Sequence, residues 1–263
     1  MFPYFQKGMD NFRKTMIRLI LIAVFLILYL ILSIPILAAE WLIARKFQYA
    51  ADISRLRMVQ WAFKVILFLS GTRLTVIGEE NVPVDQAVLY VGNHRSFFDI
   101  VITYARCPRL TGYIAKASMK NVPLLSLWMK RLYCLFLDRD NIKEGLKTIL
   151  IGIDQIKRGI SMCIFPEGTR GQGIDEMDMP PFKEGSLKMA EKTGCPIIPM
   201  ALTGTADIFE NHLPWIRSAH VILEYGKPIY PKELSREEQK RLGNYTQKKI
   251  LEMLKQSSTL PQS

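Results

Sequence analysis

The sequence contains few of the residues that bind metals and cofactors. Its 263 residues include three histidines and four cysteines, and neither set has the spacing of metal ligands. No Cys-x-x-Cys pair occurs, and the cysteines mostly lie in apolar runs, so we expect them to be reduced and buried. The glycines between positions 168 and 173 have neither dinucleotide-binding nor phosphate-loop spacing. We therefore expect neither a metal nor a cofactor.

Acidic residues are fewer than basic residues. The chain has 35 Lys and Arg against 24 Asp and Glu, which gives a formal net charge of +11. Such an excess attracts anionic lipid surfaces, phosphate groups, acidic proteins or nucleic acid. The basic residues are scattered rather than grouped into one stripe, and no nucleic-acid-binding module is recognisable, so nucleic acid is not an expected partner.

One long apolar run stands near the amino terminus. Residues 19–39 are apolar except for Ser33, which is long enough to cross a bilayer. A cleaved signal peptide is disfavoured, because its apolar region is usually only ~7 to 15 residues long. A buried core helix is also disfavoured, because the run is apolar on all sides.

A single crossing conflicts with the charges around this run. Basic residues lie on both flanks, so the positive-inside rule cannot hold for both; they are Arg13, Lys14 and Arg18 before the run and Arg45, Lys46, Arg55 and Arg57 after it. A second apolar stretch, residues 56–70, is followed by Gly71, which ends it. We therefore predict that residues 1–71 form two helical arms that enter one leaflet and leave the rest of the chain on the cytoplasmic side.

The remainder alternates between strand-like and helix-like segments. Short β-branched and aromatic runs predict strands at 74–78, 87–92, 112–115, 134–137, 162–165, 197–202 and 220–225. The clearest helix is 141–158, capped by Asn141 and ended by Gly159, and its expected apolar face is Ile142, Leu146, Ile149, Leu150, Ile153 and Ile156. A second helix, 235–256, opens with Ser235-x-x-Glu238. This alternation predicts an α/β domain over residues 72–257, with a mixed, largely parallel sheet flanked by helices, and a disordered tail at 258–263.

The first motif whose side chains could take part in a reaction follows the strand expected at 87–92. It reads Asn93-His94-Arg95-Ser96-Phe97-Phe98-Asp99. A helix that starts at Ser96 or Phe97 brings Asp99 back beside His94, where a carboxylate can orient the imidazole as a general base. The alternative is that Asp99 only favours the first turn of that helix.

The second motif, Phe165-Pro166-Glu167-Gly168-Thr169-Arg170, follows the strand at 162–165. Its arginine suits bidentate phosphate binding, and its glycine lets the backbone approach a ligand. The carboxylate of Glu167 could orient that arginine or a substrate hydroxyl. A solvated surface turn is the alternative interpretation.

Together these motifs resemble the glycerolipid acyltransferase family, and most closely its 1-acylglycerol-3-phosphate acyltransferases, whose first and third blocks they match without substitution. Residues 135–139, which read Leu-Phe-Leu-Asp-Arg, are similar to the second block of that family, and residues 195–200 are similar to the fourth. Two positions depart from the pattern. Tyr133 stands where many relatives carry glycine, and Cys195 stands where they often carry valine.

The resemblance implies that the chain transfers a fatty acyl group from acyl-coenzyme A or acyl-carrier protein, both cytoplasmic donors, to the free hydroxyl of lysophosphatidic acid at a membrane. His94 is then the base and Asp99 its support. The other implied site residues bind the substrate: Lys116, Arg139, Glu167, Gly168, Thr169, Arg170 and Lys183. Three alternatives remain at this point: another lysophospholipid or glycerol 3-phosphate as acceptor, a noncatalytic binder of lipid or carrier protein, and a hydrolase with Ser96 as nucleophile.

Overall fold

The computed structural model describes residues 2–171 and 176–257. The chain packs as two compact units. The first comprises Met1–Leu74, Ser96–Arg106 and Gly204–Val221, and the second comprises Thr75–Arg95, Cys107–Thr203 and Ile222–Ser263. The predicted tail at 258–263 lies outside the described residues.

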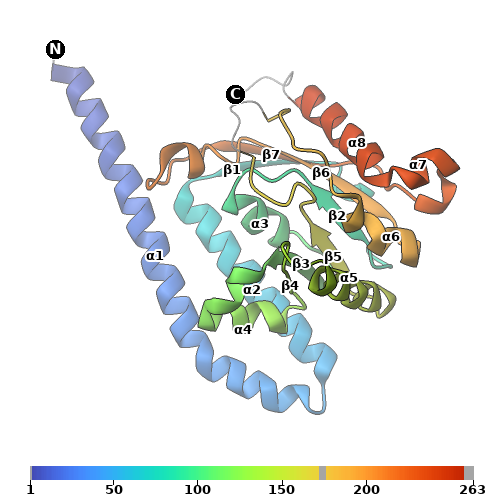
Figure 1. Ribbon diagram of the computed structural model, residues 1–263. Helices are drawn as coiled ribbons and strands as arrows, with labels where there is room; N and C mark the ends of the chain where they lie inside the picture. The colour runs from blue at the N-terminus through green and yellow to red at the C-terminus, as the bar shows by residue number, and fades with distance from the viewer. Residues whose placement is uncertain (1, 172–175, 258–263) are drawn as a thin grey trace. The chain divides into compact units, whose positions relative to one another are not determined.

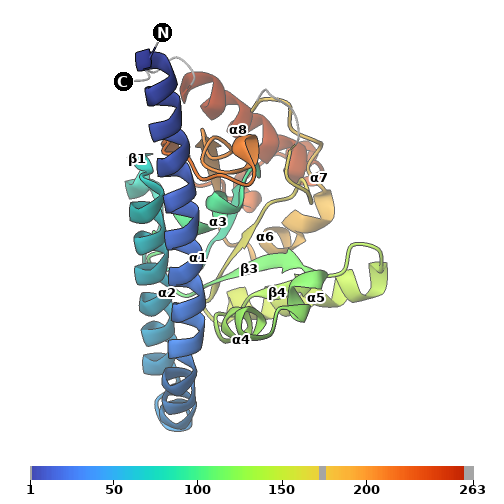
Figure 2. The same cartoon turned by 90° about the vertical axis from the view of Figure 1, so that its left-hand side faces the viewer.

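Two long helices that fold back on each other dominate the first unit. Helix α1 (Phe2–Ala44) and helix α2 (Gln48–Ser70) lie side by side along much of their length (Figure 2). By length and composition, the Phe12–Ala44 part of α1 is able to cross a membrane, and few of its side chains are buried. The second arm begins at Gln48 rather than at residue 56, and it ends as predicted at Gly71, whose φ of 72° closes the helix.

A buried ion cluster explains why the second arm begins earlier than predicted. Arg55 is 1% exposed, and its guanidinium donates to Glu40 on α1 at 3.1 Å and to Asp52 at 2.7 Å. Arg55, which the sequence analysis counted among the basic flanking residues, is therefore buried, and two buried carboxylates compensate its charge. Such clusters depend on every member, since removal of one partner leaves an uncompensated buried charge.

The sheet contains seven strands in the order β1-β7-β6-β2-β5-β3-β4 (Figure 1). Their bounds are β1 Arg73–Ile77, β2 Leu89–Gly92, β3 Thr111–Lys116, β4 Leu135–Leu137, β5 Ser161–Ile164, β6 Ile197–Thr203 and β7 His220–Tyr225. The run from β6 to β4 is parallel, and β7 pairs antiparallel with β6. The predicted strands and the mixed, largely parallel α/β class are confirmed.

Helices of the second unit cover the sheet and close a core. The remaining α-helices of the described residues are α3 Phe97–Tyr104 in the first unit, and α4 Pro123–Arg131, α5 Ile142–Lys157, α6 Lys188–Thr193, α7 Arg236–Lys240 and α8 Leu242–Ser257 in the second. Leu89, Met162 and Ile197 from neighbouring strands are fully buried, and Met189 of α6 and Ile250 of α8 pack into the same cluster. These contacts hold β2 and β5, the strands that precede the two motifs.

Two helix predictions need correction. Helix α5 has the expected Asn141 cap, but half of its predicted apolar face points to solvent, because only the side that carries Ile156 faces the core. The predicted helix 235–256 is interrupted at Arg241, where φ is −122° and ψ is 43°. Helix α8 has a separate start because the Glu184 carboxylate accepts the N–H groups of Gly243 and Asn244.

Candidate active site

The two sequence motifs meet because strands β2 and β5 are parallel neighbours. Val91 lies opposite Ile164 in the register. His94 follows the end of β2 by two residues, and Glu167 follows the end of β5 by three. Both motifs therefore leave the sheet at its carboxyl edge, where α/β proteins commonly bind ligands.

The segment 165–171, which contains the second motif and is called the third-block segment, holds the main chain of His94 from both sides. The N–H of His94 donates to Oε1 of Glu167 at 2.7 Å, and its carbonyl oxygen accepts the N–H of Gly171 at 2.8 Å. Glu167 is only 4% exposed, so this charge-assisted bond is shielded from water. The sequence interpretation gave Glu167 a substrate or an arginine as partner and missed this main-chain contact.

Neighbouring groups hold the rest of the His94 segment. The buried Asn93 amide donates to the carbonyl of Leu202 at 2.9 Å and accepts the Leu202 N–H at 2.8 Å, which joins the segment to β6. The His94 imidazole stacks on the ring of Phe165, with centroids 4.4 Å apart and planes at 18°. Phe165, the first residue of the second motif, therefore helps to orient the imidazole ring.

Helix α3 begins where the sequence predicts, with Ser96 as its cap. The hydroxyl of Ser96 accepts the N–H of Phe98 at 3.0 Å, and Oδ2 of Asp99 accepts the N–H of Ser96 at 2.8 Å. Asp99 is completely buried. Its carboxylate therefore has the helix-capping role of the alternative interpretation, and its pairing with the His94 imidazole stays a prediction.

Glu210 is a participant that the sequence interpretation missed. Its Oε1 accepts the N–H of Phe97 at 2.9 Å, and its Oε2 accepts the hydroxyl of Ser96 at 2.5 Å. Ser96 is thus a buried cap that donates to one carboxylate, which disfavours it as a hydrolase nucleophile. A separation of 114 residues between Ser96 and Glu210 left no local signal of the contact.

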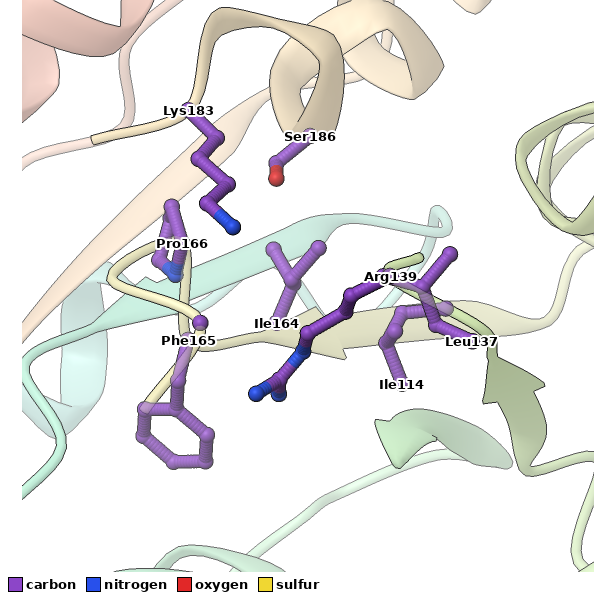
Figure 3. Close-up of a pocket in the computed structure, with 9 residues that line it drawn as sticks. Ile114, Leu137, Arg139, Ile164, Phe165, Pro166, Lys183 and Ser186 are labelled. Atoms are coloured by element: carbon purple, nitrogen blue, oxygen red, sulfur yellow. The ribbon is translucent and has the colours of Figure 1, made fainter. Parts of the chain in front are cut away.

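A pocket with two cationic side chains opens beside the third block (Figure 3). The guanidinium of Arg139 and the amino group of Lys183 extend into it from different segments. Partial burial lowers the pKa of the Arg139 guanidinium, because desolvation disfavours its charge, so an anion in contact with it regains part of the lost solvation. The lining residues are Ile114, Leu137, Arg139, Ile164, Phe165, Pro166, Gly168, Lys183 and Ser186.

Gly168 has a backbone conformation that favours glycine, and it lies close to the end of the Lys183 side chain. Its φ is 79°, in the left-handed region that side chains rarely adopt. A Cβ atom at this position would lie 3.2 Å from Nζ and 3.3 Å from Cε of Lys183. The glycine therefore lets the lysine pass directly over the third-block backbone into the pocket.

The four cysteines are shielded from solvent. All four are free and buried, which confirms the expectation of reduced, buried thiols. Burial raises the pKa of the Cys107 thiol to about 11 and that of Cys134 to about 12, and it also raises the pKa of Cys195. Thiolates at these three positions are therefore scarce at neutral pH.

Comparison with known proteins matches this arrangement to one family. The acyltransferase family model matches residues 73–203. A 1-acyl-sn-glycerol-3-phosphate acyltransferase of Borreliella burgdorferi is 31% identical over 200 residues, which are 75% of this chain and 78% of the relative. The chain belongs to the acyltransferase family. The enzyme of the same description from Saccharomyces cerevisiae is 28% identical over 202 residues, 74% of this chain and 65% of the relative.

The crystal structure of the 1-acyl-sn-glycerophosphate (LPA) acyltransferase PlsC from Thermotoga maritima shares the fold. Its TM-score is 0.81 at 23% identity, and the match covers 97% of this chain and 99% of that one. The predicted family and fold are thereby confirmed.

This acyltransferase departs from the family pattern at Tyr133, and the structure shows what the departure involves. Tyr133 has a φ of 60°, which is in the left-handed region that glycine adopts more readily than other residues. It lies just past the end of α4, where the N–H groups of Tyr133 and Cys134 donate to the carbonyls of Lys130 and Met129. This is the Schellman pattern, so the backbone keeps the glycine-type turn although a tyrosine occupies it.

The structure brings some predicted substrate-binding residues of the acyltransferase into the pocket and leaves others outside. Arg139, Gly168 and Lys183 line it. In the described part of the chain, the exposed Lys116 and Thr169 and the half-buried Arg170 are not lining residues. Ser186 lines the pocket and was missed by the sequence interpretation, although it lies only three residues beyond Lys183.

Proposed function

We propose that this acyltransferase acylates the free hydroxyl of lysophosphatidic acid from a thioester donor, acyl-coenzyme A or acyl-carrier protein, to give phosphatidic acid. One observation carries the proposal: the main chain of His94 is held by the segment that also lines the cationic pocket. An acceptor phosphate that binds Arg139 and Lys183 then lies at the sheet edge that carries the imidazole. The names of the relatives support the same acceptor.

In this mechanism the imidazole of His94 takes the proton from the acceptor hydroxyl as its oxygen bonds to the thioester carbonyl carbon. The carbon–sulfur bond then breaks, and the departing thiolate takes that proton from the imidazolium. Because a thioester is already activated, alignment and proton removal are the main tasks, worth roughly 7 to 11 kcal/mol and ~10² to 10⁴ in rate. Asp99 supports the imidazole in this proposal.

The acceptor is tested by competition among lysolipids and by removal of one pocket charge. Lysophosphatidic acid, lysophosphatidylcholine and glycerol 3-phosphate are offered together, and we expect lysophosphatidic acid to be consumed first. Lys183→Met should raise the KM for lysophosphatidic acid by about tenfold or more, because a charge-assisted hydrogen bond contributes about 1.5 to 3 kcal/mol. Lys188→Met, which removes an exposed lysine paired with Glu191, should leave it unchanged.

Preference for lysophosphatidylcholine would show that the acceptor is another lysophospholipid and not lysophosphatidic acid. Consumption of glycerol 3-phosphate alone would identify the first acylation of glycerolipid synthesis instead. If no acceptor is acylated with either donor while lysolipid still binds, the noncatalytic binder becomes the better account.

We also propose that residues 1–71 associate with the membrane as a hairpin and that residues 72–257 act as the catalytic domain on the cytoplasmic side. The apolar length of α1 and the internal compensation of Arg55 by Glu40 and Asp52 support a hairpin that enters and leaves by the same face. Cysteines introduced at the two termini should therefore react with an impermeant reagent from the same side of sealed vesicles. Labelling from opposite sides would contradict the hairpin.

A further inference from the structure

Helix α5 carries an apolar ridge that its own unit leaves exposed. The side chains of Ile142, Leu146, Leu150 and Ile151 are 90%, 61%, 57% and 42% exposed. The first three are spaced four residues apart, so they form one continuous stripe along the helix. Thr148, Gly152, Gln155 and Ile156, on the other side of the helix, are buried. A stripe of this kind marks a surface that contacts another apolar phase.

Lysines accompany the ridge. Lys143 and Lys147 each follow a ridge residue directly, and both are exposed. Lys120 and Lys130, on the segments before strand β4, are exposed as well. Helix α5 has two acidic residues: Glu144 is exposed near the start of the ridge, and Asp154 pairs with Arg158 at 3.6 Å. Large aliphatic side chains bordered by lysines are typical of helices that lie in the interface of an anionic membrane.

The ridge begins beside the cationic pocket. Ile142 follows Arg139, a lining residue of the pocket, by three positions, and both come after the carboxyl end of β4. The most exposed ridge residue is thus at the end of α5 nearest to the site. A lipid surface in contact with this end would present headgroups to Arg139.

We propose that the α5 ridge inserts into the headgroup region of an anionic bilayer, so that the catalytic unit has a membrane contact of its own beside the pocket. The partner is a lipid surface because the stripe is aliphatic, whereas protein interfaces concentrate Tyr, Trp and Arg at their centres. The lysines supply the charge complementarity, since a lysine near an anionic surface gains from its potential. Delivery of the acceptor to Arg139 is the one part of this proposal that rests on the proposed function.

A local probe tests the contact in the full chain. Because the four native cysteines are buried, a cysteine introduced as Leu146→Cys can be labelled selectively with an environment-sensitive maleimide dye. With vesicles of phosphatidylglycerol and phosphatidylcholine we expect a blue shift and quenching by bromine-labelled lipids, both weaker with phosphatidylcholine alone. The same dye at Glu237→Cys, an exposed position on α7, should show neither.

The charge reversals Lys143→Glu and Lys147→Glu should each lower the inserted fraction of the Leu146 probe about fivefold. A probe that stays in water while the chain sediments with the vesicles would overturn the proposal. A shift that needs added acyl-carrier protein would overturn it in favour of a protein-docking surface.

A kinetic comparison separates this proposal from the proposed function. Leu146→Ser with Leu150→Ser should raise the KM for lysophosphatidic acid held in vesicles by about tenfold and leave the KM for a dispersed short-chain acceptor unchanged, since only the first acceptor depends on the apolar contact with the bilayer. Equal loss on both acceptors would contradict a membrane role. If wild type acylates neither acceptor, the proposed function fails, and the probe experiment still decides whether the ridge meets lipid.

Discussion

Replacement of His94 by alanine should abolish measurable acyl transfer while the protein remains folded. We expect kcat to fall by ~10² to 10⁴ or more, because the general base is lost together with its alignment. The imidazole is half-buried and stacks on Phe165, and we expect the melting temperature in detergent to change little. Mass spectrometry of phosphatidic acid formed from lysophosphatidic acid and each thioester donor measures the effect.

The matched control is His212→Ala, which removes a second histidine that lies in the short helix Glu210–His212 rather than in the two motifs. It should retain wild-type activity. Equal product from wild type and His94→Ala would remove His94 from the mechanism. A large fall in melting temperature for His94→Ala would instead assign the residue a structural role.

Replacement of Glu167 should separate positioning of the base from contact with the substrate. In Glu167→Ala the buried N–H of His94 loses its acceptor, and we expect kcat to fall roughly 30- to 100-fold, since a displacement of about 1 Å at a reacting group can cost 10²-fold. Glu167→Gln keeps a side-chain oxygen for that N–H and should retain activity within a few-fold of wild type. The KM for lysophosphatidic acid should change little in either variant.

Glu191→Ala, which removes an exposed carboxylate of α6, provides the control for loss of a negative charge. A different pattern would favour the role that the family resemblance assigns to Glu167. If Glu167→Gln is as impaired as Glu167→Ala and both raise the KM for lysophosphatidic acid, the charge itself acts on the substrate. Rescue by glutamine, in contrast, is what a hydrogen bond to the main chain requires.

The departure at Tyr133 shows how a local motif and a global fold interact. The tyrosine keeps a left-handed turn that costs a non-glycine residue roughly 1 to 2 kcal/mol. The turn persists because the carbonyl of Tyr133 lies against Gly112 of β3, where a Cβ would come within 2.2 Å of it. The close approach of these two segments favours this turn although a tyrosine occupies position 133.

The sequence by itself determined the local elements of this protein. Runs of β-branched residues marked the strands, Asn141 and Ser96 marked helix starts, and Gly71 marked a helix end, because each signal acts through hydrogen bonds or burial within a few residues. The motifs around His94 and Glu167 likewise identified the family, since they are short, contiguous and unsubstituted.

Only the tertiary structure decided which of these residues meet. The bond between His94 and Glu167 spans 73 residues, and it exists because β2 and β5 pair in parallel and place both motifs at one edge. The Glu210 contact, the burial of Arg55 and the exposure of the α5 ridge have the same origin. No local pattern specifies them, because strand order and packing determine whether a charged side chain finds a distant partner and which face of a helix meets the core.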